Sequence, residues 1–146
     1  MNLNDATKAK IESLGIDPEF LYVNAWRINP HSNMKFQEYM LTLEFAHKFL
    51  ACALLRNEIS PETHATVSVH KTAKGVSLFL SVNDHKKLRK GEISMYDSKV
   101  LMMVKDHKTG EETPYTAIGR YILGKAIELG IKVYYAQDWK VYKEKN

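Results

Sequence analysis

The fold of this chain is decided by residues 63–82. They read Thr-His-Ala-Thr-Val-Ser-Val-His over 63–70, Lys-Thr-Ala-Lys-Gly over 71–75 and Val-Ser-Leu-Phe-Leu-Ser-Val over 76–82. Apolar and polar residues alternate in the first and third parts, which is typical of strands with one buried face. Two such runs joined by five residues that include a glycine predict a β-hairpin. One face of this hairpin is apolar and includes Leu78, whereas the other carries two histidines, four hydroxyl groups and a phenylalanine.

The segments on either side of the hairpin supply the remaining elements. Apolar spacing, caps and turn residues predict helices over 4–14, 35–56 and 114–129 and strands over 20–28, 99–105 and 131–136. Asp5 is the expected N-cap of the first helix, and Gly15 is its expected C-terminal glycine. Leu43 and Leu78 are expected in the core. Gly119 and Gly124 lower helix propensity, so we expect close packing at both positions.

This order of elements predicts one α+β domain over 1–146, with helix 4–14 as a peripheral appendage. Short connections favour an antiparallel sheet with helices 35–56 and 114–129 packed mainly on one face. Apart from one added central strand, the predicted order is the βαββαβ order of ferredoxin-like folds.

Composition and charge narrow the class of protein. The 45% hydrophobic and 26% charged residues are ordinary for a soluble globular protein. A net charge of +4 mildly favours an anionic partner. Cys52 is the only cysteine, which excludes an intramolecular disulfide and suits a reducing compartment. With neither a signal-peptide pattern nor an apolar run of roughly 20 residues, we expect a cytoplasmic protein without a membrane partner.

The histidine pattern argues against a metal site. His64 and His70 share one predicted face, but six residues of extended strand separate them by roughly 20 Å. They therefore cannot bind one ion together, and no cysteine or carboxylate spacing completes a set of ligands. No glycine-rich phosphate loop follows a predicted strand. We expect neither a metal nor a cofactor.

Residues 64–67 read His-Ala-Thr-Val, which is similar to one motif of the two-histidine phosphoesterases. On a strand, the His64 imidazole and the Thr66 hydroxyl would lie side by side, where both could contact a phosphate. The resemblance implies an enzyme in which one histidine acts as base and a second, on a facing motif, acts as acid. His-Lys-Thr recurs at 70–72 on the same strand and at 107–109 in a predicted turn.

Two further resemblances involve the first predicted strand. Leu-Tyr-Val-Asn at 21–24 resembles the first-strand motif of RNA recognition modules, whose aromatic residue stacks on a base. Lys-Gly-Val-Ser-Leu-Phe at 74–79 resembles their second motif, although aliphatic Val76 and Leu78 stand where that family has aromatics. Tyr-Val at 22–23, Ala-Trp-Arg at 25–27, Asn-Met at 33–34 and Thr-Leu at 42–43 look like the first strand and helix of phage enzymes that degrade S-adenosylmethionine.

A basic run follows the hairpin, where four of the six residues over 85–90 are Lys or Arg. Beside a polar sheet face, this run favours a small binding domain for an anionic ligand, with nucleic acid or a nucleotide as the best interpretation. The expected ligand-binding residues are basic groups for phosphates, histidines as hydrogen-bonding groups and one stacking ring: Lys86, Lys87, Arg89, Lys90, His64, His70 and Phe79.

Two alternatives stay open beside this interpretation. One is a nucleotide- or S-adenosylmethionine-directed enzyme, with His64 and Thr66 as the candidate catalytic residues. The other is a stoichiometric inhibitor or adaptor that binds a protein partner. The sequence does not decide between an enzyme and a binding protein, and it does not fix the oligomeric state.

Overall fold

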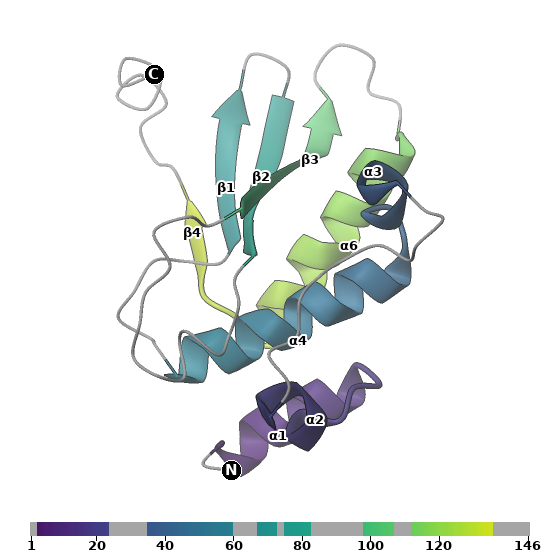
Figure 1. Cartoon of the computed structure of the whole chain (residues 1–146). Helices are drawn as coiled ribbons and strands as arrows, with labels where there is room; N and C mark the ends of the chain where they lie inside the picture. Colours follow the sequence, from purple (N-terminus) through teal and green to yellow (C-terminus); the bar gives the residue numbers. More distant parts are fainter. Residues whose placement is uncertain are drawn as a thin grey trace. The chain divides into compact units, whose positions relative to one another are not determined.

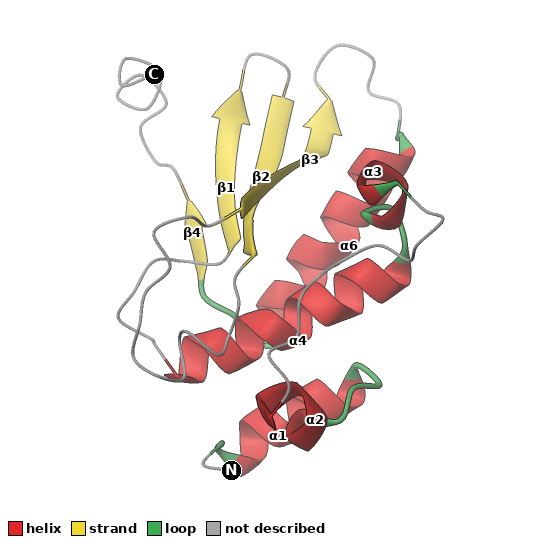
Figure 2. Ribbon diagram, viewed as in Figure 1, coloured by secondary structure: helices red, strands yellow, loops and turns green. Residues whose placement is uncertain are grey.

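A computed structural model of the chain describes residues 3–23, 35–59, 67–72, 75–82, 98–106 and 112–135. Figures 1 and 2 show the helices and strands that these residues form. The chain divides into two compact units. The first unit holds the helices up to residue 59, and the second holds the sheet and the last helix. The single domain expected over 1–146 stays a prediction.

Helix α1 (Asp5–Ser13) begins at Asn4, whose Oδ1 accepts a hydrogen bond of 2.7 Å from the N–H of Ala6. The prediction that Asp5 is the N-cap was therefore wrong by one position. Asparagine and aspartate cap helices equally well, so neighbouring residues of these types leave the starting position open. The end of α1 is as expected, because Gly15 adopts a φ of 77° just beyond it.

Helix α1 packs against helix α4 (Leu43–Ile59) and buries Ile11 completely. The carboxylate of Glu58, near the end of α4, lies at the N-terminus of α1. Its two oxygens are each 3.0 Å from the Asn4 nitrogen, and the Thr7 hydroxyl donates to one of them at 2.8 Å. A carboxylate in this place satisfies helix N–H groups and interacts favourably with the helix dipole. Helix α1 is thus anchored on α4.

Helix α2 (Pro18–Val23) occupies the beginning of the segment that was predicted as a strand over 20–28. The strand prediction is wrong for residues 20–23, and residues 24–28 lie outside the described ranges. Asp17 explains the difference, because its side chain accepts from the Glu19 N–H at 3.0 Å and its carbonyl accepts from the Leu21 N–H at 3.0 Å. Aspartate followed by proline starts a helix more strongly than the aromatic and branched residues favour a strand.

The single helix predicted over 35–56 is two helices, α3 (Phe36–Tyr39) and α4. Thr42 separates them. Its hydroxyl donates to the Tyr39 carbonyl at 2.7 Å and accepts from the Phe45 N–H at 3.1 Å, which caps α4. Leu43 consequently lies at the first position of α4 and is 55% exposed, so its predicted place in the core was wrong.

The core of the first unit contains a row of aromatic side chains. Tyr39 and Phe45 meet edge to face with ring centroids 5.8 Å apart, and Phe45 stacks on Phe49 at 6.2 Å. All three residues are at most 1% exposed. Lys48 places its ammonium 5.9 Å from the Tyr39 ring centroid and 3.7 Å from a Glu44 carboxylate oxygen. These contacts fix α3 beside the start of α4.

The second unit contains a four-stranded sheet of β1 (Val67–Thr72), β2 (Gly75–Val82), β3 (Ser98–Asp106) and β4 (Val133–Tyr135), in the order β3-β2-β1-β4. The predicted hairpin is confirmed, since β1 and β2 pair antiparallel. Its connection is shorter than predicted, because pairing continues to Thr72 opposite Gly75, which has a φ of 139°. Glycine suits this turn because other residues rarely adopt such a φ.

The prediction of a wholly antiparallel sheet was wrong, because β4 pairs with β1 in parallel. Among the described strands β3 ends the sheet order, although its two apolar faces had suggested an interior strand. With α2 over residues 20–23, the ferredoxin-like βαββαβ order is not confirmed. The α+β class is confirmed by the four strands and the helices.

Helix α6 (Pro114–Glu128) confirms the helix predicted over 114–129, with Thr113 as its N-cap. It lies against β3 at one glycine (Figure 1): a Cβ built on Gly119 would be 2.5 Å from the Met103 carbonyl oxygen and 3.6 Å from Val104 Cγ2. The expected close packing is therefore present at Gly119. It is absent at Gly124, where nothing lies within 4 Å.

Candidate functional site

The register of the hairpin sorts its residues onto two faces. Val67 pairs with Leu80 and Val69 with Leu78, so these four residues share one face. Val67, Leu78 and Leu80 are completely buried, which confirms the predicted core position of Leu78. Val104 of β3 lies close to α6 at Gly119, so the helix lies near the sheet at β3.

The opposite face carries the polar residues that were predicted to bind a ligand. The pairs Ser68 with Phe79 and His70 with Ser77 lie on it. His70 is only 8% exposed and Ser77 only 1% exposed. The Ser77 hydroxyl is 3.2 Å from the Met103 sulfur of β3. This face is therefore covered at His70 and Ser77, whereas Ser68 is half-buried.

The parallel register adds one aromatic ring to this polar face. Tyr134 of β4 is directly opposite Ser68, and its ring centroid is 6.4 Å from that of His70 with a tilt of 50°. Tyr134 is 56% exposed. The sheet thus places the exposed Tyr134 ring beside the buried His70 imidazole. Ser68, on the neighbouring strand β1, lies directly opposite Tyr134.

Most of the predicted site residues lie outside the described part of the chain. This applies to His64, Thr66, Lys86, Lys87, Arg89 and Lys90. The backbone of Phe79 is placed on β2, but its side chain is not described. Of the predicted ligand-binding side chains, His70 alone has a described position. The constellation therefore stays a prediction.

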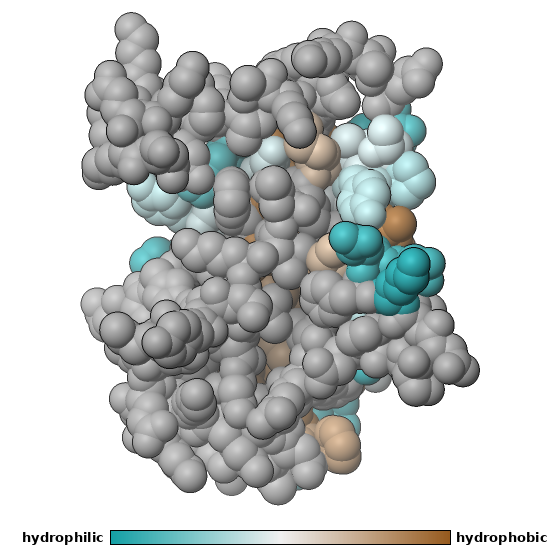
Figure 3. Space-filling view, turned by 45° about the horizontal axis from the view of Figure 1, so that its top comes forward, coloured by the Kyte–Doolittle hydropathy of each residue, from teal (hydrophilic) through white to brown (hydrophobic). Residues whose placement is uncertain are grey.

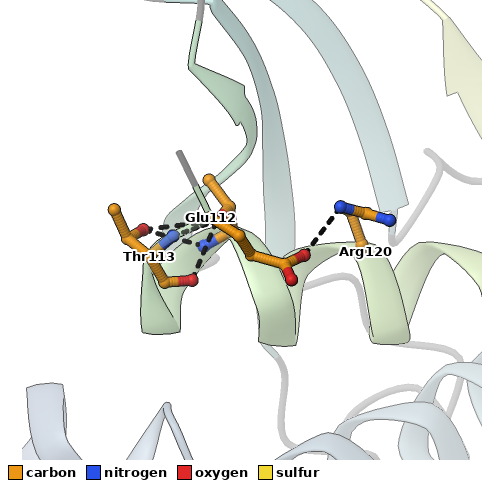
Figure 4. A network of polar contacts seen from close by, with 4 residues as sticks. Glu112, Thr113 and Arg120 are labelled. Carbon is orange, nitrogen blue, oxygen red and sulfur yellow. Dashed lines mark hydrogen bonds and ion pairs between the residues drawn. The ribbon is translucent and has the colours of Figure 1, made fainter. Parts of the chain in front are cut away.

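The N-terminus of α6 is closed by its own cap and offers little to an anion (Figure 4). The Thr113 hydroxyl accepts from the Thr116 N–H at 3.2 Å, and the Thr116 hydroxyl accepts from the Thr113 N–H at 2.6 Å. This capping box uses helix donors that could otherwise bind a phosphate. Glu112 also places a carboxylate nearby, with one oxygen 2.7 Å from Arg120 Nη1.

The cysteine of α4 has the wrong environment for a nucleophile. Burial raises the pKa of the Cys52 thiol from 9.0 to about 12, although the Lys48 ammonium acts in the opposite direction. A thiol with such a pKa carries almost no thiolate at neutral pH, and the thiolate is the reactive form. Burial, together with the charge and hydrogen bond of Glu44, likewise raises the pKa of Tyr39 to about 12.

Neither a metal-binding cluster nor a membrane-spanning helix occurs among the described residues. In these ranges, no three His, Cys, Asp or Glu side chains gather in a way that could hold a metal ion. No helix among them is long and apolar enough to cross a membrane.

Sequence reasoning did not single out Tyr134 as a neighbour of His70. The strand prediction over 131–136 included it, and alternation alone separates Tyr134 from Tyr135. Alternation cannot say which of the two shares a face with His70, because that depends on the register between β4 and β1.

Comparison with protein-family models, with curated proteins and with solved structures found no match to this chain.

Proposed function

We propose that this protein binds an anionic ligand, nucleic acid or a nucleotide, through the polar face of the hairpin and the basic run over 85–90. The observation that carries the proposal is the position of this run in the chain. It begins three residues after Val82, the last residue of the strand whose polar face carries Ser77 and Phe79. Lys86, the first of the four cations, is thus only four residues beyond that strand along the chain.

Each group has a defined role in this proposal. Lys86, Lys87, Arg89 and Lys90 bind phosphates and release the counterions that those phosphates hold. The face of the sheet contributes hydroxyl groups and aromatic rings for the sugar and the base. His64 supplies a hydrogen bond to the ligand. His70, being 8% exposed, acts mainly by supporting the surface on which the ligand rests.

The test is the salt dependence of oligonucleotide binding. In a variant with Lys86, Lys87, Arg89 and Lys90 replaced by Gln, affinity should fall, and the slope of log K against log salt should fall by roughly 0.7–0.9 for each cation that no longer binds a phosphate. Fluorescence anisotropy with a labelled single-stranded oligonucleotide measures both quantities.

The matched control removes the same charge elsewhere, with Gln at Lys8, Lys10, Lys35 and Lys125. These lysines belong to described helices or their ends and lie outside the basic run. The control should keep most of the affinity. Equal losses in the two variants would show that only net charge matters, and a wild-type protein that binds no oligonucleotide or nucleotide would refute the proposal.

A further inference from the structure

Large hydrophobic side chains reach the surface at several described positions. On the face drawn in Figure 3, both hydrophilic and hydrophobic described residues are visible. The exposed ones are Phe20, Leu43, Tyr115, Ile127, Tyr134 and Tyr135. Tyr134 differs from the others because it shares a sheet face with a histidine and with hydroxyl groups. Its surroundings can therefore recognise a polar aromatic ligand.

One buried neighbour, His70, restricts the orientation of the Tyr134 ring. Strand β4 places Tyr134 opposite Ser68, and the buried His70 imidazole lies 6.4 Å away, centroid to centroid. A buried neighbour restricts the ring without covering it, since 56% of the residue remains exposed. A ring that is already oriented loses little conformational entropy when a ligand stacks on it.

We infer that Tyr134 is the platform on which a base of single-stranded nucleic acid stacks, with His70 as the residue that positions its ring. The inference rests on the proposed function and names a residue that the basic run does not include. Lys132 is exposed and lies two residues before Tyr134, just before the start of β4. A base on Tyr134 would thus have a cation nearby for its phosphate.

The chain provides a matched control in the next residue. Tyr135 has the same side chain, lies on the same strand and is 48% exposed. It pairs with Val69 and therefore belongs to the apolar face. The two variants Tyr134→Ala and Tyr135→Ala each remove a tyrosine side chain, from opposite faces of one strand.

The experiment measures binding of a labelled oligouridylate of about 12 nucleotides to the full chain by fluorescence anisotropy. Tyr134→Ala should weaken binding roughly 5- to 150-fold, the range expected when one base no longer stacks on a ring. Tyr134→Phe should keep the wild-type affinity, because the ring remains. Tyr135→Ala should also keep it, and Tyr134→Ala should leave the salt slope unchanged because every phosphate contact remains.

Several outcomes would overturn the inference. Equal affinities of Tyr134→Ala and Tyr135→Ala would do so, as would a lower melting temperature of Tyr134→Ala with unchanged affinity. Ultraviolet cross-linking of the wild-type complex gives a readout that does not depend on the folding of a variant. The adduct should map to Tyr134, and an adduct elsewhere refutes the inference.

The two proposals fail in different ways. If the wild-type chain binds neither the oligouridylate nor any other oligonucleotide or nucleotide, both proposals are wrong. If it binds a nucleotide but not the oligouridylate, only the stacking platform is wrong. If it binds with a salt slope that depends on the basic run but is insensitive to Tyr134, only the stacking platform is wrong.

Discussion

Gly119 and Gly124 are five positions apart on α6 and have opposite surroundings. A methyl group at Gly119 would meet the Met103 carbonyl oxygen at 2.5 Å, and backbone cannot move aside as the end of a side chain can. A methyl group at Gly124 would meet nothing within 4 Å. The same substitution therefore has two physical consequences in one helix.

Gly119→Ala should lower the free energy of unfolding by about 1–3 kcal/mol, because α6 must shift away from β3. Gly124→Ala should raise it by up to about 1 kcal/mol, since alanine has the higher helix propensity and no neighbour is disturbed. Urea unfolding followed by circular dichroism measures both values. A neutral or stabilising Gly119→Ala would show that α6 does not lie against β3.

Among the elements, α1 depends on an interaction that is distant in sequence. Its first turn is completed by Glu58, which is 54 residues beyond Asn4. The apolar side of α1 is small, with Ile11 as its buried residue, so the polar interaction matters more than in a wide amphipathic helix.

Glu58→Ala should destabilise the first unit by about 1–2 kcal/mol, because the Asn4 N–H and the Thr7 hydroxyl lose a charged acceptor. Amide exchange should become faster in α1 and remain unchanged in α6. Glu12→Ala is the control, since Glu12 is an exposed carboxylate on α1 itself. Similar exchange rates in the two variants would mean that Glu58 does not hold α1.

For the whole molecule, two acidic groups whose pKa values are raised by burial make stability depend on alkaline pH. The pKa of Cys52 is raised from 9.0, and that of Tyr39 from 10.0, in each case to about 12. At a pH between the ordinary pKa of each group and its raised pKa in the folded chain, the folded chain keeps protons that the unfolded chain releases. The free energy of unfolding must then fall as pH rises from about 9 to 12.

Cys52→Ala removes one of the two groups and should make this decline shallower, by at most about 1.4 kcal/mol per pH unit for one proton. Urea titrations at several pH values between about 6 and 11 measure the slope. The variant and the wild type should have the same slope below about pH 8, where the thiol stays protonated in the folded and the unfolded chain. Parallel curves throughout the alkaline range would show that the thiol is not buried.

The local sequence was sufficient for elements whose signals lie within a few residues. The hairpin follows from alternation around Gly75, and α6 follows from Thr113 and Pro114 at its start. Where local signals compete, prediction failed: Asp17 starts a helix in a segment rich in aromatic and branched residues, and Thr42 divides a helical stripe in two. Capping hydrogen bonds decide such cases, and hydrophobic periodicity does not contain them.

The site shows the same division between local and distant information. Alternation by itself determined that His70 and Ser77 lie on the polar face of the hairpin. Only the tertiary structure decided that both are buried, that β4 runs parallel to β1 and that Tyr134 joins their face. Alternation has the same period in parallel and antiparallel strands, and the register between β1 and β4, which β2, β3 and α6 separate along the chain, depends on packing. The residues of each face could therefore be predicted, whereas their neighbours across the sheet could not.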